Sequence, residues 1–151
     1  MSPLPELAFE QLGTTQAAVT ELVNVLVERG KAAKRDGYLL EAISIRLYLC
    51  EFYLRVVVVA HTGRDFDPGR NMTFGRLIER AADCHLEEDL LTRLRRFNKA
   101  RNNAVHGLLE GRVAYADLER EVFDNDPSLL IDLSDWLDSV YFAAGPRGLT
   151  P

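Results

Sequence analysis

The sequence predicts an all-α protein, an up-and-down bundle of four to five helices in one domain. Apolar residues recur at intervals of three and four over long stretches, which is the pattern of amphipathic helices. Residues that cap or stop helices stand where these stretches begin and end. A length of 151 residues, with 47% hydrophobic and 27% charged residues, is typical of a folded globular chain.

The first helix is expected to begin at Thr14 or Thr15, either of which can act as an N-cap. An irregular arm, residues 1–14, precedes it. The helix extends to about Arg35, where Asp36-Gly37 supplies a stop signal. Its apolar positions follow helical spacing: Ala18, Val19, Leu22, Val23, Leu26 and Val27.

The second helix is expected over Tyr38–His61. Its apolar residues surround most of the helix, which indicates a central, buried position. Val56–Val59 alone would favour a strand, but the run is far longer than a typical strand and has no internal turn signal. After a loop over residues 62–72, Thr73 can cap a short third helix, Phe74–Cys84, with Leu77, Ile78, Ala81 and Ala82 facing inward.

A fourth helix is expected from near Leu86 to His106, with Gly107 as the residue that ends it. A short helix follows over Tyr115–Phe123. Asp126 is then expected to cap a last helix that begins at Pro127 and runs to about Ala143, before a flexible tail over residues 144–151. Its inward positions are expected to be Leu130, Leu133, Trp136, Leu137, Val140 and Tyr141.

Composition limits the function classes. The net charge of −5 argues against a surface that is basic throughout, but not against one local basic groove. Cys50 and Cys84 lie far apart, which indicates buried thiols in a reducing compartment rather than a disulfide framework or a zinc site. No stretch is long and apolar enough for a membrane span, and no signal peptide is apparent. We therefore expect a cytoplasmic protein with no metal and no cofactor.

The fourth helix carries an unusual basic run, Arg93–Gly107 (RLRRFNKARNNAVHG). A turn of about 100° per residue places Arg101 on the apolar stripe of this helix and five other polar residues on an adjacent face. The residues of that face are Arg95, Asn98, Lys99, Asn102 and His106.

Arg101 and His106 are the chemically informative residues of this run. An arginine on an apolar stripe is desolvated and needs a partner, which could be a carboxylate of the second helix such as Glu41 or Glu51. A histidine at a helix C-terminus could serve as a plain capping residue. Asn102 lies one turn before His106 and could hydrogen-bond to its ring.

The stretch Arg101-Asn102-Asn103-Ala104-Val105-His106 has the form R-x4-H, with a polar residue directly after the arginine and Gly107 after the histidine. In this it resembles the HEPN superfamily of all-α domains, and the expected order of helices over residues 15–143 is similar too. The resemblance implies a metal-independent endoribonuclease, a homodimer in which two motifs line one cleft, and a role as a toxin or phage-defence component with an antitoxin or other regulatory protein as partner.

Carried over to this chain, the resemblance implies that His106 is a general base or acid, that Arg101 stabilises charge on the phosphoryl group, and that Asn102 orients His106 or holds a phosphate oxygen. The helical wheel, not the family, suggests that Arg95, Lys99 and Asn98 contact RNA. A toxin subgroup has a tyrosine two residues after the histidine, where this chain has Leu108. Antitoxin control through that tyrosine is therefore not expected.

Two other functions remain open at this point. One is a HEPN-like module that binds a nucleotide or a protein without catalysis. The other is a purely structural or regulatory helical dimer, in which Arg101 would contribute only to stability.

Overall fold

The computed structural model describes residues 9–64 and 72–142. Within these ranges every regular element is helical and no strand occurs, so the predicted all-α class is confirmed. The main helices are α2 (Gln16–Arg35), α3 (Leu39–Thr62), α4 (Phe74–Asp83), α5 (Glu88–Leu109) and α6 (Leu129–Leu137). The shorter elements are the 3₁₀ helix η1 (Tyr115–Asp117) and two π-helical segments, η2 (Arg120–Asp124) and η3 (Asp138–Phe142).

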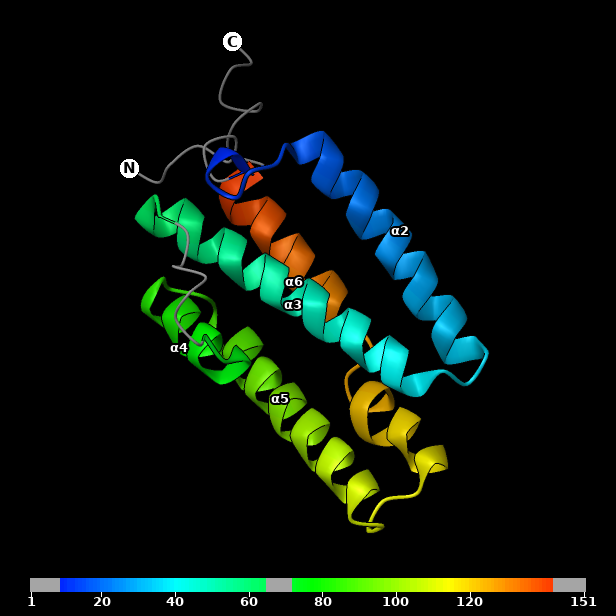
Figure 1. Ribbon diagram of the computed structural model, residues 1–151. Coiled ribbons are helices and arrows are strands. Elements are labelled where there is room, and N and C mark those ends of the chain that lie inside the picture. The colour runs from blue at the N-terminus through cyan, green and yellow to red at the C-terminus, as the bar shows by residue number, and fades with distance from the viewer. Residues whose placement is uncertain (1–8, 65–71, 143–151) are drawn as a thin grey trace.

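Helix α3 is the centre of the bundle, as its apolar circumference predicts. It packs against α2, α4 and α6, while α5 packs against α4, α6 and η2 (Figure 1). Every residue from Val56 to Ala60 is buried, so the valine run is the interior of a helix and not a strand. None of the described helices is long and apolar enough to cross a membrane.

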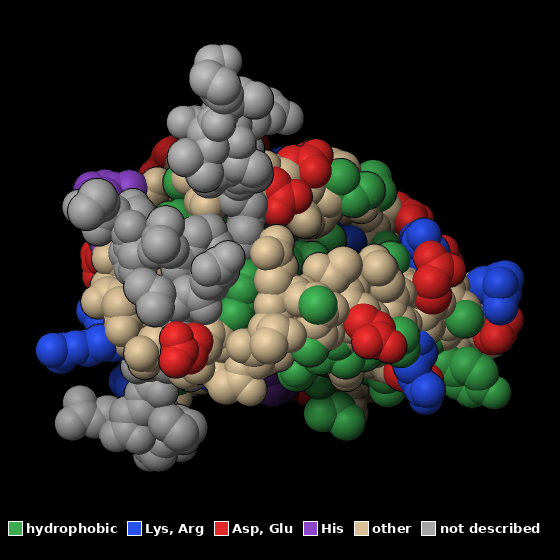
Figure 2. Space-filling model, turned by 90° about the horizontal axis from the view of Figure 1, so that it is seen from above, with side chains coloured by type: hydrophobic (Ala, Val, Ile, Leu, Met, Phe, Trp, Pro, Cys, Tyr) green, Lys and Arg blue, Asp and Glu red, His purple; other side chains and the backbone are tan. Residues whose placement is uncertain are grey.

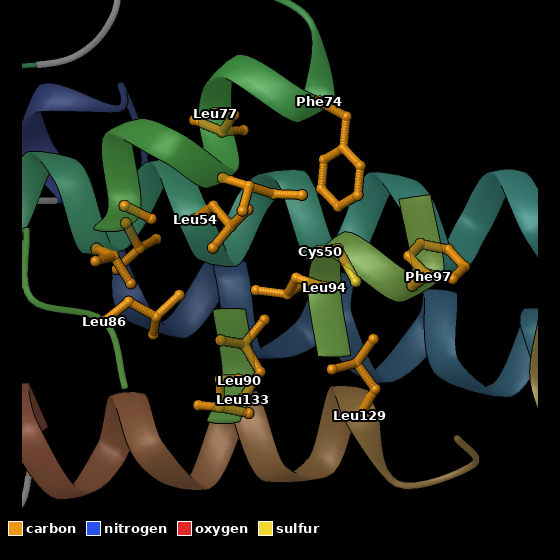
Figure 3. Packing of buried hydrophobic residues seen from close by; sticks show 14 of the residues in the cluster. Cys50, Leu54, Phe74, Leu77, Leu86, Leu90, Leu94, Phe97, Leu129 and Leu133 are labelled. Carbon is orange, nitrogen blue, oxygen red and sulfur yellow. The ribbon is translucent and has the colours of Figure 1, made fainter. Parts of the chain in front are cut away.

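The core lies where α3, α4, α5 and α6 meet. Cys50 and Leu54 of α3 converge there with leucines from the other three helices (Figure 3). Phe74 of α4 and Phe97 of α5 meet edge to face with ring centroids 6.1 Å apart, an arrangement that aromatic pairs favour. Burial raises the pKa of the Cys50 thiol to about 12, so this cysteine is a core residue and not a nucleophile.

Both threonine caps are confirmed. The Thr15 hydroxyl accepts a hydrogen bond from the amide of Ala18, and the Thr73 hydroxyl accepts one from Arg76, each at 3.2 Å. These bonds satisfy amides that have no partner inside the helix. At the other end of α2, Asp36 is the C-cap and Gly37 follows with a φ of +83°.

The expected end of the fourth helix is wrong. Helix α5 continues through His106 and Gly107 to Leu109, and Gly111, with a φ of +72°, follows the C-cap Glu110. Gly107 is buried inside the last turn because Val113 returns onto it. A Cβ at Gly107 would lie 2.5 Å from Val113 Cγ2. Close packing, and not backbone conformation, is what requires glycine at this position.

The expected start of the last helix is also wrong. Helix α6 begins at Leu129 with Ser128 as its N-cap, and Asp126 does not cap it. The Asp126 carboxylate instead accepts two hydrogen bonds from Arg93 of α5, both 2.9 Å long. A bidentate pair with a guanidinium is stronger than a cap to a neutral amide.

Two further expectations need correction. Val140 does not face inward: it is 44% exposed, because the backbone widens into the π-helical turns of η3. The helix expected over Tyr115–Phe123 is present but irregular, since it joins the 3₁₀ turn η1 to the π-helical η2. The chain before residue 9, residues 65–71 and the predicted tail over residues 144–151 lie outside the described residues.

Candidate functional site

Arg93, the first residue of the basic run, is paired within the protein. Arg93 is largely buried and contacts three carboxylates: Asp126 at 2.9 Å, Asp132 at 2.7 Å and Asp89 at 3.4 Å. It also donates to the Ser128 hydroxyl. These hydrogen bonds raise the pKa of Arg93 and lower that of Asp132. Arg93 therefore fastens α5 to the start of α6 and is not available to RNA.

Arg95, which the helical wheel assigns to RNA binding, has a protein partner. Its Nε and Nη2 donate to the two carboxylate oxygens of Glu79 in α4, at 3.0 and 3.2 Å, and its Nη1 lies 3.5 Å from Glu88. Lys99, by contrast, is exposed and forms no ion pair with any other residue of the described chain. Of these two side chains, Lys99 is the one free to meet a phosphate.

Arg101 occupies the half-buried position that its place on the apolar stripe predicts. Its Nη2 donates to the Asn98 side-chain oxygen at 3.1 Å, and its Nε is buried with no hydrogen-bond partner in the described parts of the chain. This bond also uses the Asn98 oxygen, so Asn98 holds Arg101 instead of presenting that oxygen to solvent.

Neither carboxylate considered as a partner for Arg101 forms an ion pair with it among the described residues. Glu41 is held by Arg29 at 2.8 Å. Glu51 is half-buried, and desolvation raises its pKa, while the nearby charges of Arg101 and Arg55 oppose that rise. The guanidinium of Arg101 thus lies in the field of Glu51 but is not neutralised by direct contact.

His106 and Asn102 are both exposed on the last turns of α5. The expected hydrogen bond between the Asn102 side chain and the His106 ring is not present. Within the described chain neither side chain forms a hydrogen bond of its own, and both are open to a ligand. His106 lies five positions after Arg101, so the two side chains diverge by about 140° around one helix.

The face of the molecule seen from above, on the side of α2 and away from the end of α5, is mixed in charge. On the face seen in Figure 2, acidic and basic side chains lie interspersed and form no continuous basic surface. Such a surface agrees with the net charge of −5 and supplies little non-specific attraction for nucleic acid. Any RNA binding would depend on a few local contacts.

Metal ligation finds no support in the described residues, where no group of three or more histidine, cysteine or acidic side chains comes together. His61 and His85 are neighbours, with ring centroids 5.4 Å apart and the planes at 71°. Two imidazoles without a third ligand fall short of a protein metal site.

Arg46 and Tyr115 have roles that the sequence analysis did not find. Arg46 is buried in α3, with its guanidinium 5.0 Å from the Phe97 ring centroid and 5.5 Å from that of Phe123. The Tyr115 hydroxyl joins the turn between α2 and α3 through Gly37 and Leu39. An arginine inside a long apolar run was the available signal for Arg46; no signal near Tyr115 indicated its partners.

Comparison with known proteins adds no family. The chain matches no protein-family model, and neither the curated proteins nor the solved structures include one that is significantly similar to it. The functional argument therefore depends on the residues themselves.

Proposed function

We propose that this protein is a metal-independent endoribonuclease of HEPN type, of the kind found in toxin–antitoxin and phage-defence systems. One observation carries the proposal: the end of α5 combines an incompletely paired Arg101 with an exposed, uncommitted His106 and Asn102. This is the set of groups that the R-x4-H motif requires for phosphoryl chemistry, and the protein uses none of the three fully for its own structure.

The reaction needs one proton acceptor, one proton donor and a positive charge. Imidazole of His106 takes the proton of a ribose 2′-hydroxyl, whose oxygen attacks the adjacent phosphorus. The bond to the 5′-oxygen breaks, and that oxygen leaves with the proton that the His106 imidazolium returns. The products are a 2′,3′-cyclic phosphate and a 5′-hydroxyl. Arg101 stabilises the negative charge that gathers on the phosphoryl oxygens, and Asn102 positions the ring or the phosphate.

A second copy of the chain completes the site in this proposal. Arg101 and His106 point away from each other on one helix, so a single α5 does not aim both at one phosphate. Two helices related by a two-fold axis bring the arginine of one copy and the histidine of the other together. Leu109, only three residues beyond His106, is 79% exposed and offers an apolar contact for such a dimer.

RNA cleavage in the presence of EDTA tests the proposal. We expect wild-type protein to cleave RNA, and His106→Ala and Arg101→Ala each to lower the rate by roughly 10²- to 10⁴-fold. His61→Ala and Arg96→Ala are the matched controls, because both residues are exposed and lie outside the motif. Equal rates for the motif variants and their controls would refute the proposal, as would a wild-type protein that is inactive on every RNA tested.

A non-catalytic HEPN-like module that binds a nucleotide or a protein is the second candidate. The bidentate engagement of Arg95 by Glu79 favours it, since that pair removes one cation expected to hold the RNA backbone. Thermal stabilisation by a nucleotide without RNA turnover would support this candidate. Loss of stability in Arg101→Ala, with no activity or ligand to lose, would indicate a purely structural role.

A further inference from the structure

A groove of about 400 Å³ opens between α2, α3 and the beginning of α6. The three helices run beside one another in Figure 1, and α2 contributes only one fully buried residue to the bundle, Ala33. The groove is lined mainly by aliphatic side chains. They include Val27 from α2, Ile45 and Leu49 from α3, and Leu130 and Ile131 from α6. A volume of this size lies in the range of roughly 300 to 1,000 Å³ typical of small-molecule sites.

Arg46 gives this apolar groove a buried positive charge. The residue lines the groove and is only 6% exposed. Its Nη2 donates to the backbone carbonyl of Asp126, and its Nε has no hydrogen-bond partner among the described residues. Desolvation by burial lowers the pKa of Arg46, so a charged guanidinium at this position costs free energy of folding.

No carboxylate of the described chain pairs with Arg46 directly. The carboxylate of Asp126, whose charge acts on Arg46, accepts hydrogen bonds from Nε and Nη2 of Arg93 instead. The aromatic rings of Phe97 and Phe123 offer cation–π contact but do not neutralise the charge. A buried guanidinium in this state attracts an anionic acceptor more strongly than an exposed one does.

Three cations line the groove, Lys31, Lys34 and Arg46, against the single carboxylate of Asp135. Lys31 is paired with Glu28 at 3.1 Å, just outside the lining. Lys34 meets its acidic neighbours only at 3.6 and 3.8 Å, and its Nζ lies 5.3 Å from the Phe123 ring centroid. Of these three cations, Arg46 is therefore the one without a carboxylate partner among the described residues, and it is the group that an anion in the groove would meet.

We propose that this groove binds a small amphipathic monoanion, with its apolar body along α2 and α6 and its carboxylate or sulfonate directed towards Arg46. A nucleotide fits the lining less well, because its several phosphates and polar base require more donors than one arginine and two lysines within aliphatic walls. This site is separate from Arg101 and His106 and does not depend on the proposed ribonuclease activity.

Calorimetric titration with decanoate and with 1-decanol tests the proposal, because the two probes share a chain and differ in charge. We expect wild-type protein to bind decanoate more tightly than decanol. Ile131 is 63% exposed at the groove, so its substitution spares the core. Ile131→Glu should weaken decanoate binding roughly three- to tenfold and Ile131→Lys should strengthen it, with little change for decanol. Val25→Glu, 58% exposed on α2 and outside the lining, is the control.

Arg46→Met provides an independent variant, checked for folding by circular dichroism. It should remove the preference for decanoate over decanol. The proposal is overturned if decanoate does not bind, if both probes bind equally, or if Val25→Glu matches Ile131→Glu. It is also overturned if the wild type is a dimer that Ile131→Glu converts to a monomer, since the groove would then be a subunit interface.

Discussion

Arg93 and Asp126 show how one pair of residues fixes the relation between two helices. Their side chains are each 16% exposed, and the guanidinium also contacts Asp132 and Ser128 at the start of α6. Removal of either partner would destabilise the protein, because the other charge would remain buried and unpaired. The register of α5 against α6 follows from this contact.

Acid should weaken that contact through Asp132. The hydrogen bond from Arg93, followed by that from Ser128, lowers the pKa of Asp132 in the folded protein. At pH values between the pKa of Asp132 in the folded protein and its ordinary pKa, the unfolded chain therefore binds more protons than the folded protein does. The stability that this carboxylate supplies is consequently lost as the pH falls below about 4. Urea unfolding from roughly pH 2 to pH 6 should show a shallower decline for Asp132→Asn than for wild type.

Asp83→Asn is the control for this measurement, because Asp83 is exposed and forms no ion pair in the described parts of the chain. An unchanged pH profile in Asp132→Asn would contradict the prediction.

Tyr115 should contribute measurably to stability through its hydroxyl. That group donates to the Gly37 carbonyl at 2.6 Å and accepts from the Leu39 amide at 2.9 Å. Tyr115→Phe keeps the ring and removes both bonds, so we expect a loss of about 1 kcal/mol in urea unfolding. Tyr48→Phe serves as the control, since Tyr48 is similarly exposed and its hydroxyl has no partner among the described residues. Equal effects of the two substitutions would show that the Tyr115 bonds add nothing.

Helix α5 has two parts with different surroundings. Its first half carries Arg93 and Arg95, which pair with carboxylates of other elements, and the leucines that enter the core. Its last turns expose Asn102 and His106 and pack only through Ala104 and Gly107 among their fully buried positions. The end of α5 is therefore placed by a small contact area, and the Gly107–Val113 contact is central to it.

Gly107→Ala tests that contact. Alanine favours a helix interior over glycine by about 1 kcal/mol, so a helix without tertiary constraints would gain stability. Here the new Cβ would lie 2.5 Å from Val113 Cγ2 and 3.2 Å from Val113 Cβ, and the β-branched side chain would have to move. We expect a net loss of about 1 to 2 kcal/mol in urea unfolding, largely restored by adding Val113→Ala.

Gly75→Ala in α4 is the matched control for Gly107→Ala. Its Cβ would come no closer than 3.6 Å, to the Asn98 side chain, which is ordinary contact. That substitution should be neutral or stabilising. If the Gly107→Ala protein is as stable as the Gly75→Ala protein, the loop at Val113 moves aside at little cost and the prediction is wrong.

At the scale of the whole molecule, the proposed activity depends on a second copy of the chain. If each site takes Arg101 from one copy and His106 from the other, an Arg101→Ala and a His106→Ala protein complement each other. Random mixing makes half of the dimers mixed, and each mixed dimer has one intact site. The mixture should then recover about a quarter of the wild-type RNA cleavage rate, although each variant alone is inactive.

Cleavage assays on the refolded mixture check this expectation, with light scattering to confirm the dimer. No recovery in a mixture that does form dimers would mean that each site draws both residues from one chain. A protein that is active as a monomer would contradict the shared site altogether.

The sequence by itself determined the helical class, the central place of α3 and the helix starts at Thr15 and Thr73. Apolar periodicity and capping are local properties, set by residues within a few positions of each other. The sequence also singled out Arg101 as half-buried and His106 as a residue near the helix end, because a helical wheel needs only the spacing along one helix.

Only the tertiary structure decided what those side chains contact. Arg93 meets Asp126 across 33 residues of chain, and Arg95 meets Glu79 across 16. Gly107 is enclosed by a loop that returns after the helix has ended. Local spacing carries no information about which residues from distant parts of the chain pack together. It therefore could not show that Asp126 pairs with an arginine instead of capping α6, or that Arg46 is buried beneath an apolar groove.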